Sequence, residues 1–506
     1  MSESTPLLPK HAPSSQGLSW HTLTTLFLAV LVVCLMETGG VMESIPLAEI
    51  TEDIVCRSYI SQSESLAGSA AAEDRCKQPD VQADVANIQA WRSTVETIPS
   101  LLLAVPYGLL ADKYSASKIL ALSGLGGALV MMLDLFICLN AATVSVKLLI
   151  LSPLLTVVGG GGGVFIAMIY SIIGDTTTAT NRATVFSLMF SGVLVAKLIA
   201  TALTYYTMAV STWLCLYTSI GVSLVASIIS YFIPESGAGA PKSRFNGKTP
   251  PQSLFDLDDL TIRDRLNNLV YSIKAAVRWA CVENRSAALV TSTLILTSLG
   301  GYAKILELQY ITKRYGTSWP EAAMLLNSRT ITSLVLFIAV IPAISQYLTK
   351  SLRLTPTQKD LLLARVSILF NVLGCVIVGL AINIPIVVIG TVVMSFGSGF
   401  IVSCMSLVSS LVPGGKSSSL YTVIGLMQSV GILISGPIIA AIFKLGLNMG
   451  GIWIGMPYIV VAGTYGLTFV ILGFVTLDGR ENRGDAESVY EMPLRDNIIE
   501  THSIYS

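Results

Sequence analysis

Long apolar runs separated by short polar segments recur along most of the chain. A helix needs about 20 mostly apolar residues to cross a bilayer, and twelve windows are long enough. These windows lie at residues 22–45, 87–110, 118–140, 147–173, 183–206, 212–233, 286–311, 321–345, 361–382, 384–411, 417–444 and 451–476. The pattern predicts an all-α membrane protein with twelve transmembrane helices.

A polar stretch at residues 234–285 divides these windows into six and six. It is rich in Pro, Gly, Ser and Lys, and its second part has the apolar spacing of an amphipathic surface helix. Many secondary transporters consist of two six-helix halves. We expect a cytosolic tail, a six-helix half, a cytosolic linker, a second six-helix half and a second cytosolic tail at 1–21, 22–233, 234–285, 286–476 and 477–506.

Basic residues indicate the orientation, because Lys and Arg concentrate on the cytosolic side of membrane proteins. With both termini inside, the inner segments hold nineteen basic residues and the outer loops hold seven. The first outer loop, 46–86, is acidic and contains Cys56 and Cys76. Disulfides persist in oxidising compartments, so we expect these cysteines to be bridged; the alternative is two free thiols.

Composition excludes several classes of protein. The hydrophobic fraction is 53% and the charged fraction 12%, whereas soluble domains have about 25% charged residues. The net charge of zero gives no basic excess for nucleic acid. The three histidines, His11, His21 and His502, lie near the ends, and no Cys/His cluster has metal-ligand spacing. We expect no enzyme active site, no metal and no cofactor.

The segment GLLADKYSASK follows the second window. It shares five residues with the loop signature of the major facilitator superfamily, namely Gly108, Ala111, Asp112, Lys113 and Lys118. Ser115 replaces a glycine of that signature, and Ser117 replaces a basic residue. The resemblance implies that Asp112 pairs with basic residues across the interface of the two halves and forms a conformational latch.

Longer segments resemble a fungal branch of this superfamily that is distantly similar to the proton-coupled folate transporter group. Examples are LELQYITKRYGTSWPEAAMLLNSR and FGSGFIVSCMSLVSSLVP, and the resemblance covers about residues 20–476. It implies the twelve-helix major facilitator fold. The fourth helix lacks the arginine of many proton-coupled members, and Gly436-Pro437 is a partial echo of a drug-antiporter motif. These departures leave the direction of transport open.

Five consecutive glycines interrupt the fourth window. They are Gly159, Gly160, Gly161, Gly162 and Gly163. A phosphate-binding loop would need a following Gly-Lys-Ser/Thr, which this run lacks. In a membrane helix, small residues let neighbouring helices approach closely. We expect the glycines to serve helix packing and to bend or unwind the helix locally.

Charged residues inside the windows are the candidate site. Each charge at the bilayer centre costs about 2.5–3.5 kcal/mol, so such residues usually face a bundle interior or an aqueous path. We assign a substrate or proton pathway to Glu37, Arg92, Glu96, Lys197, Lys304, Glu307 and Arg329. Glu43 has the same character, whereas Asp134 and Arg365 lie nearer helix ends, from which they could reach water.

Two pairs of these charges share a helix face. Lys304 and Glu307 are three residues apart, and Arg92 and Glu96 are four apart, so each pair can offset its own desolvation. The pairs are either functional or purely structural. No histidine lies within a window, so a coupling proton would need a carboxylate, for which Glu37, Glu96 and Glu307 are the choices.

Three functions remain open. The first is secondary active export of a small organic solute, such as a fungal secondary metabolite, by alternating access. The second is proton-coupled import of an organic anion, and the third is a non-transporting membrane sensor. The expected partners are a small-molecule substrate, the lipid bilayer and, as a candidate, protons; we expect a monomer and no nucleic acid.

Short signals in the tails and linker bear on location. Glu3, Leu7 and Leu8 match an acidic dileucine sorting pattern, which favours a vacuolar or endosomal address over the plasma membrane. Asn284 begins a glycosylation sequon. We expect that sequon to stay unmodified, because the predicted topology places it inside the cell.

Overall fold

The computed structural model describes residues 20–62, 76–177, 179–234, 285–411 and 417–475. In these ranges the amino-terminal half contains α1 (Trp20–Gln62), α3 (Pro79–Tyr114), α4 (Ala116–Leu139), η1 (Val146–Ile150), η2 (Ser152–Val157), α5 (Gly161–Thr176), α6 (Ala179–Val210) and α7 (Thr212–Tyr231). The carboxy-terminal half contains α9 (Arg285–Tyr315), α10 (Trp319–Val335), the π-helical η4 (Leu336–Val340), α11 (Ile341–Lys350), α12 (Pro356–Leu380), α13 (Ile384–Phe396), α14 (Gly399–Leu411), α15 (Ser417–Met449), η5 (Gly451–Gly455) and α16 (Met456–Gly473).

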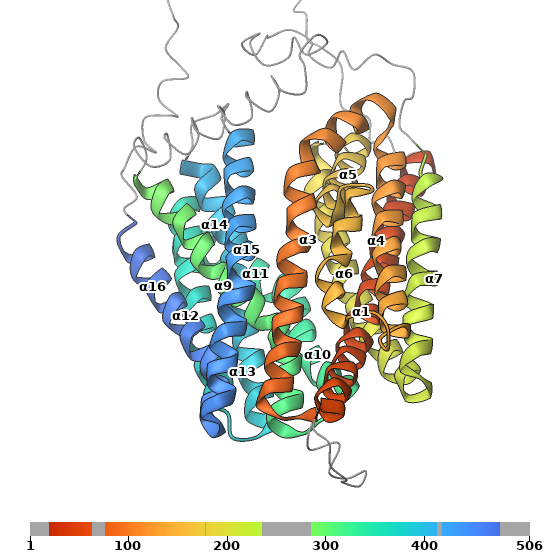
Figure 1. Ribbon diagram of the computed structural model, residues 1–506. Coiled ribbons are helices and arrows are strands. Elements are labelled where there is room, and N and C mark those ends of the chain that lie inside the picture. Colours follow the sequence, from red (N-terminus) through yellow and green to blue (C-terminus); the bar gives the residue numbers. More distant parts are fainter. Residues whose placement is uncertain (1–19, 63–75, 178, 235–284, 412–416, 476–506) are drawn as a thin grey trace, which may run out of the picture.

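The helices form two bundles that stand side by side (Figure 1). The bundles meet where α3 packs along α15 and where α6 packs along α10. In the described ranges, eleven helical segments are long and apolar enough to cross a membrane. The 36-residue α3, which carries Arg92 and Glu96, is not one of the eleven, although it lies beside α15 at the interface between the bundles.

The two ends of the molecule are named here by their landmarks. A disulfide joins Cys56 near the end of α1 to Cys76 just before α3, and we call this the disulfide end. At the opposite end α7 finishes and α9 begins (Figure 1), and we call it the linker end.

The first helix continues well beyond its predicted window of 22–45. It runs to Gln62, and α3 begins at Pro79, so most of the stretch predicted as an outer loop is helical. Leu47, Ile50 and Val55 of α1 are buried against residues of α3 such as Val85. Hydropathy identifies the part of a helix that crosses the membrane. The buried apolar residues of α1 continue beyond that part, and the helix continues with them.

The fourth window is broken, as its glycines suggest. Two 3-10 segments, η1 and η2, lead to a turn in which Gly159, Gly160 and Gly161 have φ values of +88°, +80° and +71°, and α5 begins there. These are left-handed backbone conformations that glycine adopts readily and other residues rarely do. The run therefore divides the span into an irregular half and a helical half.

The tenth window is also divided. Helix α13 ends at Phe396 and α14 begins at Gly399. The side-chain amide of Asn371 in α12 donates to the Gly397 carbonyl at 2.9 Å, which supplies a partner for a backbone group that the break would leave unpaired. Each half thus contains an interrupted span of this kind.

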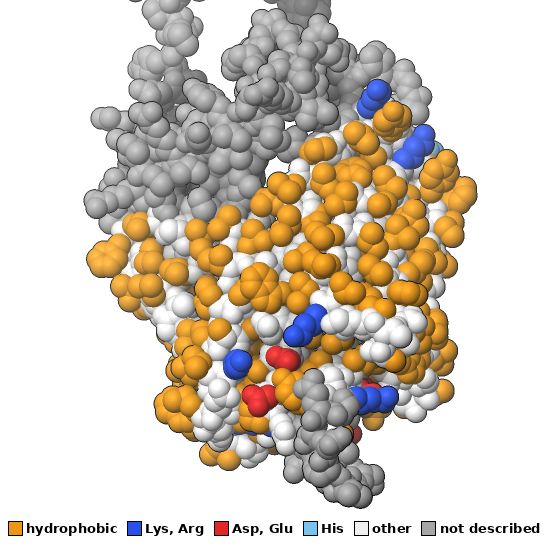
Figure 2. All heavy atoms as spheres, viewed as in Figure 1, with side chains coloured by type: hydrophobic (Ala, Val, Ile, Leu, Met, Phe, Trp, Pro, Cys, Tyr) orange, Lys and Arg blue, Asp and Glu red, His pale blue; other side chains and the backbone are white. Residues whose placement is uncertain are grey.

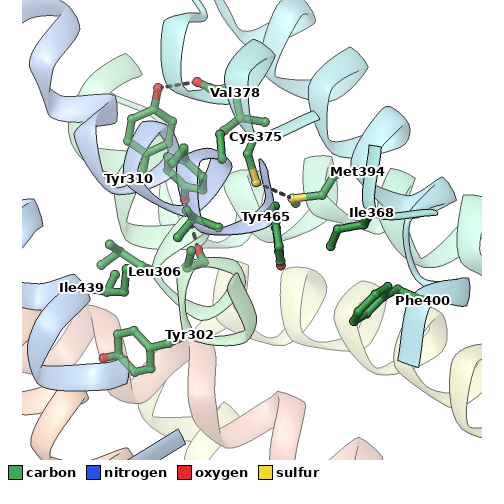
Figure 3. Close-up of a cluster of buried hydrophobic side chains, with 14 of the residues drawn as sticks. Tyr302, Leu306, Tyr310, Ile368, Cys375, Val378, Met394, Phe400, Ile439 and Tyr465 are labelled. Atoms are coloured by element: carbon green, nitrogen blue, oxygen red, sulfur yellow. Dashed lines mark hydrogen bonds between the residues drawn. The ribbon is translucent and has the colours of Figure 1, made fainter. Parts of the chain in front are cut away.

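Both bundles have a buried interior, and their exterior is apolar (Figure 2). In the carboxy-terminal half, the hydroxyl of Tyr310 donates to the Val378 carbonyl at 2.9 Å within a cluster that also contains Met394 and Phe400 (Figure 3). Figure 2 shows hydrophobic side chains across the side of the molecule, with charged ones gathered towards the disulfide end and at the upper edge. Such a surface fits a lipid environment.

Several predictions fall outside the described residues. They are the sorting pattern at Glu3, Leu7 and Leu8, the sequon at Asn284, the amphipathic linker helix and the side chain of Asp112.

Candidate functional site: a charged cavity in the amino-terminal half

Arg92 of α3 binds two carboxylates from two other helices. Its Nη2 atom lies 3.0 Å from Glu43 Oε1 of α1 and 2.7 Å from Asp134 Oδ2 of α4. The side chain of Asp134 is 2% exposed and that of Glu43 is 12% exposed. One guanidinium therefore faces two nearly buried carboxylates, so the trio has one excess negative charge when all three groups are ionised.

A cavity of about 450 Å³ adjoins this trio. Four charged side chains line it, from α1 and α3: Glu37, Glu43, Arg92 and Glu96. The rest of the wall is mostly apolar and includes Met36, Met131, Phe165, Ile166, Met189 and Phe190. A few charges in an otherwise apolar pocket are typical of sites for small organic molecules.

The broken fourth span forms part of the same wall. Gly161 and Gly162, at the start of α5, line the cavity. The Gly163 N–H donates to the hydroxyl oxygen of Ser100 in α3 at 3.2 Å, and the Ser123 hydroxyl donates to the Gly161 carbonyl at 3.0 Å. The glycine run thus exposes backbone to the cavity and is held by neighbouring serines.

The other acidic side chains of the cavity differ in their partners. Glu37 lies 2.8 Å from Lys197 Nζ of α6, and both side chains are partly exposed. Glu96 is exposed to the cavity and has no ion-pair partner among the described residues. Counting these two carboxylates and Lys197 with the trio, the ionised site has an excess of two negative charges.

Arg92 and Glu96 interact electrostatically, as their shared helix face predicts, but they form no salt bridge among the described residues. Arg92 turns instead to α1 and α4, because Glu43 and Asp134 offer buried oxygens that need a cation. The expectation that Asp134 could reach water is wrong, since its side chain is 2% exposed and contacts Arg92 inside the bundle. Arg365 donates to the Leu472 carbonyl of α16 at 2.8 Å.

In the seventh helix, Glu307 forms its salt bridge with a residue of another helix, in addition to the expected interaction with Lys304. Glu307 of α9 has no exposed side-chain surface, and its Oε2 atom lies 2.6 Å from Arg329 Nη1 of α10. Lys304 is close enough to interact electrostatically with both, but it makes no salt bridge in the described part of the chain. Lys304 lies near Glu307 because the two residues share a helix face. The salt bridge to Glu307 is made instead by the guanidinium of Arg329, which extends from α10.

The loop signature occupies the junction of α3 and α4. Gly108, Ala111, Asp112 and Lys113 lie in the last turns of α3, and Lys118 lies in the first turn of α4. The Lys113 ammonium is 5.5 Å from the centre of the Tyr114 ring. The latch role of this motif stays a prediction.

Sequence reasoning did not assign Asp134 to the site and left Glu43 out of its final set. Asp134 lies six positions before the end of its window at 118–140, and a short carboxylate cannot reach water from there. The signal available in the sequence was side-chain length, because Lys and Arg can extend to water from within a membrane helix and Asp cannot. The convergence of three helices on Arg92 had no sequence signal.

Residues 78–435 match the model of the Major Facilitator Superfamily, which is well over half of the chain. The chain belongs to the major facilitator superfamily. This is a family of transporters and not of enzymes. It follows that the chain is an integral, multi-pass membrane protein with the all-helical fold of that family.

Fungal transporters are similar to this facilitator over nearly its whole length. The MFS efflux pump atnC of Emericella nidulans is 29% identical over 473 residues, which cover 91% of this chain and 90% of atnC. The MFS-type transporter aprT of Aspergillus flavus is 26% identical over 477 residues, covering 93% of this chain and 92% of aprT.

Solved structures agree with the fold. The D-xylose-proton symporter superposes with a TM-score of 0.63 at 11% identity, and the match covers 90% of this chain and 98% of the symporter. At that identity the likeness shows the shared fold alone.

Proposed function

We propose that this facilitator is a secondary active exporter of a small organic metabolite, as expected of a fungal secondary-metabolite pump. Relatives named as efflux pumps, atnC and ustT, align with most of its length, and its cavity has the apolar wall and few charges that suit an organic solute. The proposed location is the plasma membrane or the vacuolar membrane, from either of which export removes the compound from the cytosol.

The observation that carries the mechanism is the shared arginine. Two carboxylates on one guanidinium leave an uncompensated negative charge in a nearly buried place, which is strongly unfavourable unless a cation or a proton offsets it. Asp134 Oδ1 is buried and has no hydrogen-bond partner. A proton shared by Glu43 and Asp134 would remove the excess charge.

Export follows if this proton is exchanged for substrate. The trio faces the cavity through Glu43 and Arg92, so a substrate in the cavity alters the field at the carboxylates. Loss of the proton on one side of the membrane and its uptake on the other would then couple the proton gradient to substrate movement. Lys197, Glu37 and Glu96 form the rest of the proposed substrate or proton pathway.

The direction of transport is tested by metabolite profiling. The gene is deleted in its native host and restored either as wild type or with Arg92→Ala, and metabolites are quantified in cells and in the medium. We expect at least one compound to fall in the medium and to accumulate in cells after deletion, with rescue by wild type alone. Unchanged profiles in both compartments would contradict export.

Proton coupling is tested with the compound so identified, in membrane vesicles with and without an imposed pH gradient. Glu43→Gln and Asp134→Asn each remove a titratable group with little change of shape. We expect both variants to lose gradient-driven transport while retaining exchange of labelled for unlabelled substrate. Full gradient-driven transport in both variants would place the proton elsewhere.

One observation favours a second candidate, the proton-coupled import of an organic anion. Lys304 is a half-buried cation without a salt bridge in the described ranges, and an anionic substrate could supply its partner. The sequence resemblance to the folate transporter group points the same way. The profiling experiment separates the two, since loss of an importer leaves a compound in the medium instead of in the cells.

A further inference from the structure

A buried carboxylate links the two halves at the disulfide end. Glu52 of α1 is 6% exposed. Its Oε1 atom accepts a hydrogen bond from Lys77 at 2.6 Å, and its Oε2 atom accepts one from the indole N–H of Trp319 at 2.6 Å. Trp319 is the first residue of α10 in the other half, so this carboxylate holds one half against the other.

A second bridge lies beside the first. Gln82 of α3 is fully buried and donates its amide to Glu52 and to the Cys76 carbonyl, the latter at 3.0 Å. Gln309 of α9 donates to the Gln82 backbone carbonyl at 2.8 Å and to its side-chain oxygen at 3.0 Å. Glu52 and Gln82 therefore each connect the amino-terminal half to the carboxy-terminal half.

The disulfide places a third element of this network. Cys76 is held to Cys56 of α1, which fixes Lys77 immediately after it. The Lys77 ammonium contacts Glu52 and lies 5.8 Å from the centre of the Trp319 ring. Its carbonyl accepts a hydrogen bond from the Lys313 ammonium of α9. Lys77 thus touches the opposite half through its side chain and its backbone.

Three residues of the network also line an open groove. Glu52, Lys77 and Trp319 line a groove of about 1570 Å³ at the disulfide end. Ala86 lies one turn beyond Gln82 on α3 and is fully buried in a cluster dominated by the carboxy-terminal half. Separation of the halves at this end would strip Glu52 of the Trp319 donor and expose Ala86.

We propose that Glu52 is the centre of a gate at the disulfide end, and that the Cys56–Cys76 bridge keeps this gate closed by holding Lys77 in place. Hydrogen bonds to a buried charge are among the strongest in proteins, so they favour the closed arrangement. The bridge lowers the entropy lost when Lys77 is ordered between the halves. The disulfide then controls which conformation is populated, beyond stabilising the fold.

The test measures how fast a thiol under the gate reacts. An Ala86→Cys substitution is labelled with a membrane-impermeant maleimide from the membrane side that labels Ala142→Cys, an exposed loop position at the same end, and mass spectrometry quantifies each site. The effects of Glu52→Gln, Trp319→Phe and Cys56→Ser with Cys76→Ser are compared. Arg57→Ala, which removes an exposed ion pair of the same helix end, is the control.

We expect about tenfold faster labelling at position 86 in Glu52→Gln, in Trp319→Phe and in the double serine variant, because each removes part of a charge-assisted network. Arg57→Ala should label at the wild-type rate. Combining Glu52→Gln with the serine pair should add little, since both act on one network.

Two outcomes would overturn the proposal. One is a wild-type labelling rate in Glu52→Gln and Trp319→Phe, neither of which alters a cysteine. The other is full additivity of Glu52→Gln and the serine pair, which would give the disulfide a separate structural role. Thermal stability of each variant is measured in parallel, and the test uses no substrate, so it is independent of the proposed function.

Discussion

Arg329 reaches from α10 to α9, where Glu307 is completely enclosed. Its guanidinium supplies the charge that makes this burial tolerable, although Glu307 Oε1 still has no hydrogen-bond partner. Removing one member of a buried pair costs about 3–5 kcal/mol, because the other charge stays behind without compensation. Lys304, one turn away on α9, has no such bond to lose.

The two cations should therefore respond differently to truncation. Arg329→Ala is expected to lower the free energy of unfolding of the detergent-purified protein by about 3–5 kcal/mol. Lys304→Ala should change the same quantity by less than about 1 kcal/mol. Adding Glu307→Gln to Arg329→Ala should recover part of the loss. Equal losses in the two single variants would mean that Lys304 is the partner of Glu307.

The sequence located charged residues within the spans, and it did not indicate their partners. Glu37, Arg92, Lys197, Glu307 and Arg329 are all within windows and all form ion pairs. Spacing along one helix identifies neighbours on that helix only, while each of these bonds joins different helices. The packing of the whole bundle decides which helices face one another. The sequence alone therefore could not predict the partner of each charge.

At the scale of elements, the glycine run turns an apolar window into a broken span. A Cβ at Gly159 would overlap backbone atoms of Leu122 and Ser123 in α4, and the residue has φ +88°. Gly162 is only three positions along, yet it lies in regular helix with no atom within 4 Å of the place of its Cβ. The requirement for glycine therefore differs along the run. Gly159 needs glycine for its backbone conformation and close packing, and Gly162 has neither constraint.

This difference predicts opposite outcomes for two similar substitutions. Gly159→Ala is expected to destabilise the protein by more than about 1–2 kcal/mol, the cost of a left-handed backbone for alanine, because a backbone clash adds to it. Gly162→Ala should be neutral or stabilising by up to about 1 kcal/mol. Apparent melting temperatures measure both, and equal destabilisation would show that crowding at Gly159 is not the cause.

The turn between α3 and α4 offers a further comparison. Ser115 has φ 150° and ψ 142°, a region occupied almost only by glycine, and the superfamily signature has a glycine at this place. Its hydroxyl accepts from the Lys118 N–H at 3.3 Å, a cap whose replacement by glycine costs only a few tenths of a kcal/mol.

Relief of backbone strain should outweigh the lost cap. Ser115→Gly is expected to raise stability by about 1 kcal/mol, whereas Ser115→Ala, which keeps the strain and loses the cap, should lower it. Melting curves of the two variants in the same detergent test this. A stability loss in Ser115→Gly as large as in Ser115→Ala would show that the cap dominates.

For the whole molecule, length and hydropathy were enough to predict two helical halves, because a membrane admits few other solutions. They did not predict that α1 runs on to Gln62, since that extension packs on α3 outside the windows. Nor could they show that Glu52 and Gln82 tie the halves together at the disulfide end. Those contacts arise only when both halves are assembled.

The distribution of basic residues, nineteen against seven, predicts an orientation in which the disulfide end lies outside the cytosol. In intact cells, a membrane-impermeant maleimide should therefore label Ala142→Cys, an exposed position between α4 and η1, and spare Ser243→Cys in the 234–285 linker. Permeabilised cells should label both variants, which controls for the reactivity of each thiol. For a vacuolar protein, isolated intact vacuoles should give the reverse pattern, since their cytosolic face is outermost. Labelling of both sites in intact cells would contradict the two-half topology, because each end of the bundle must face one side only.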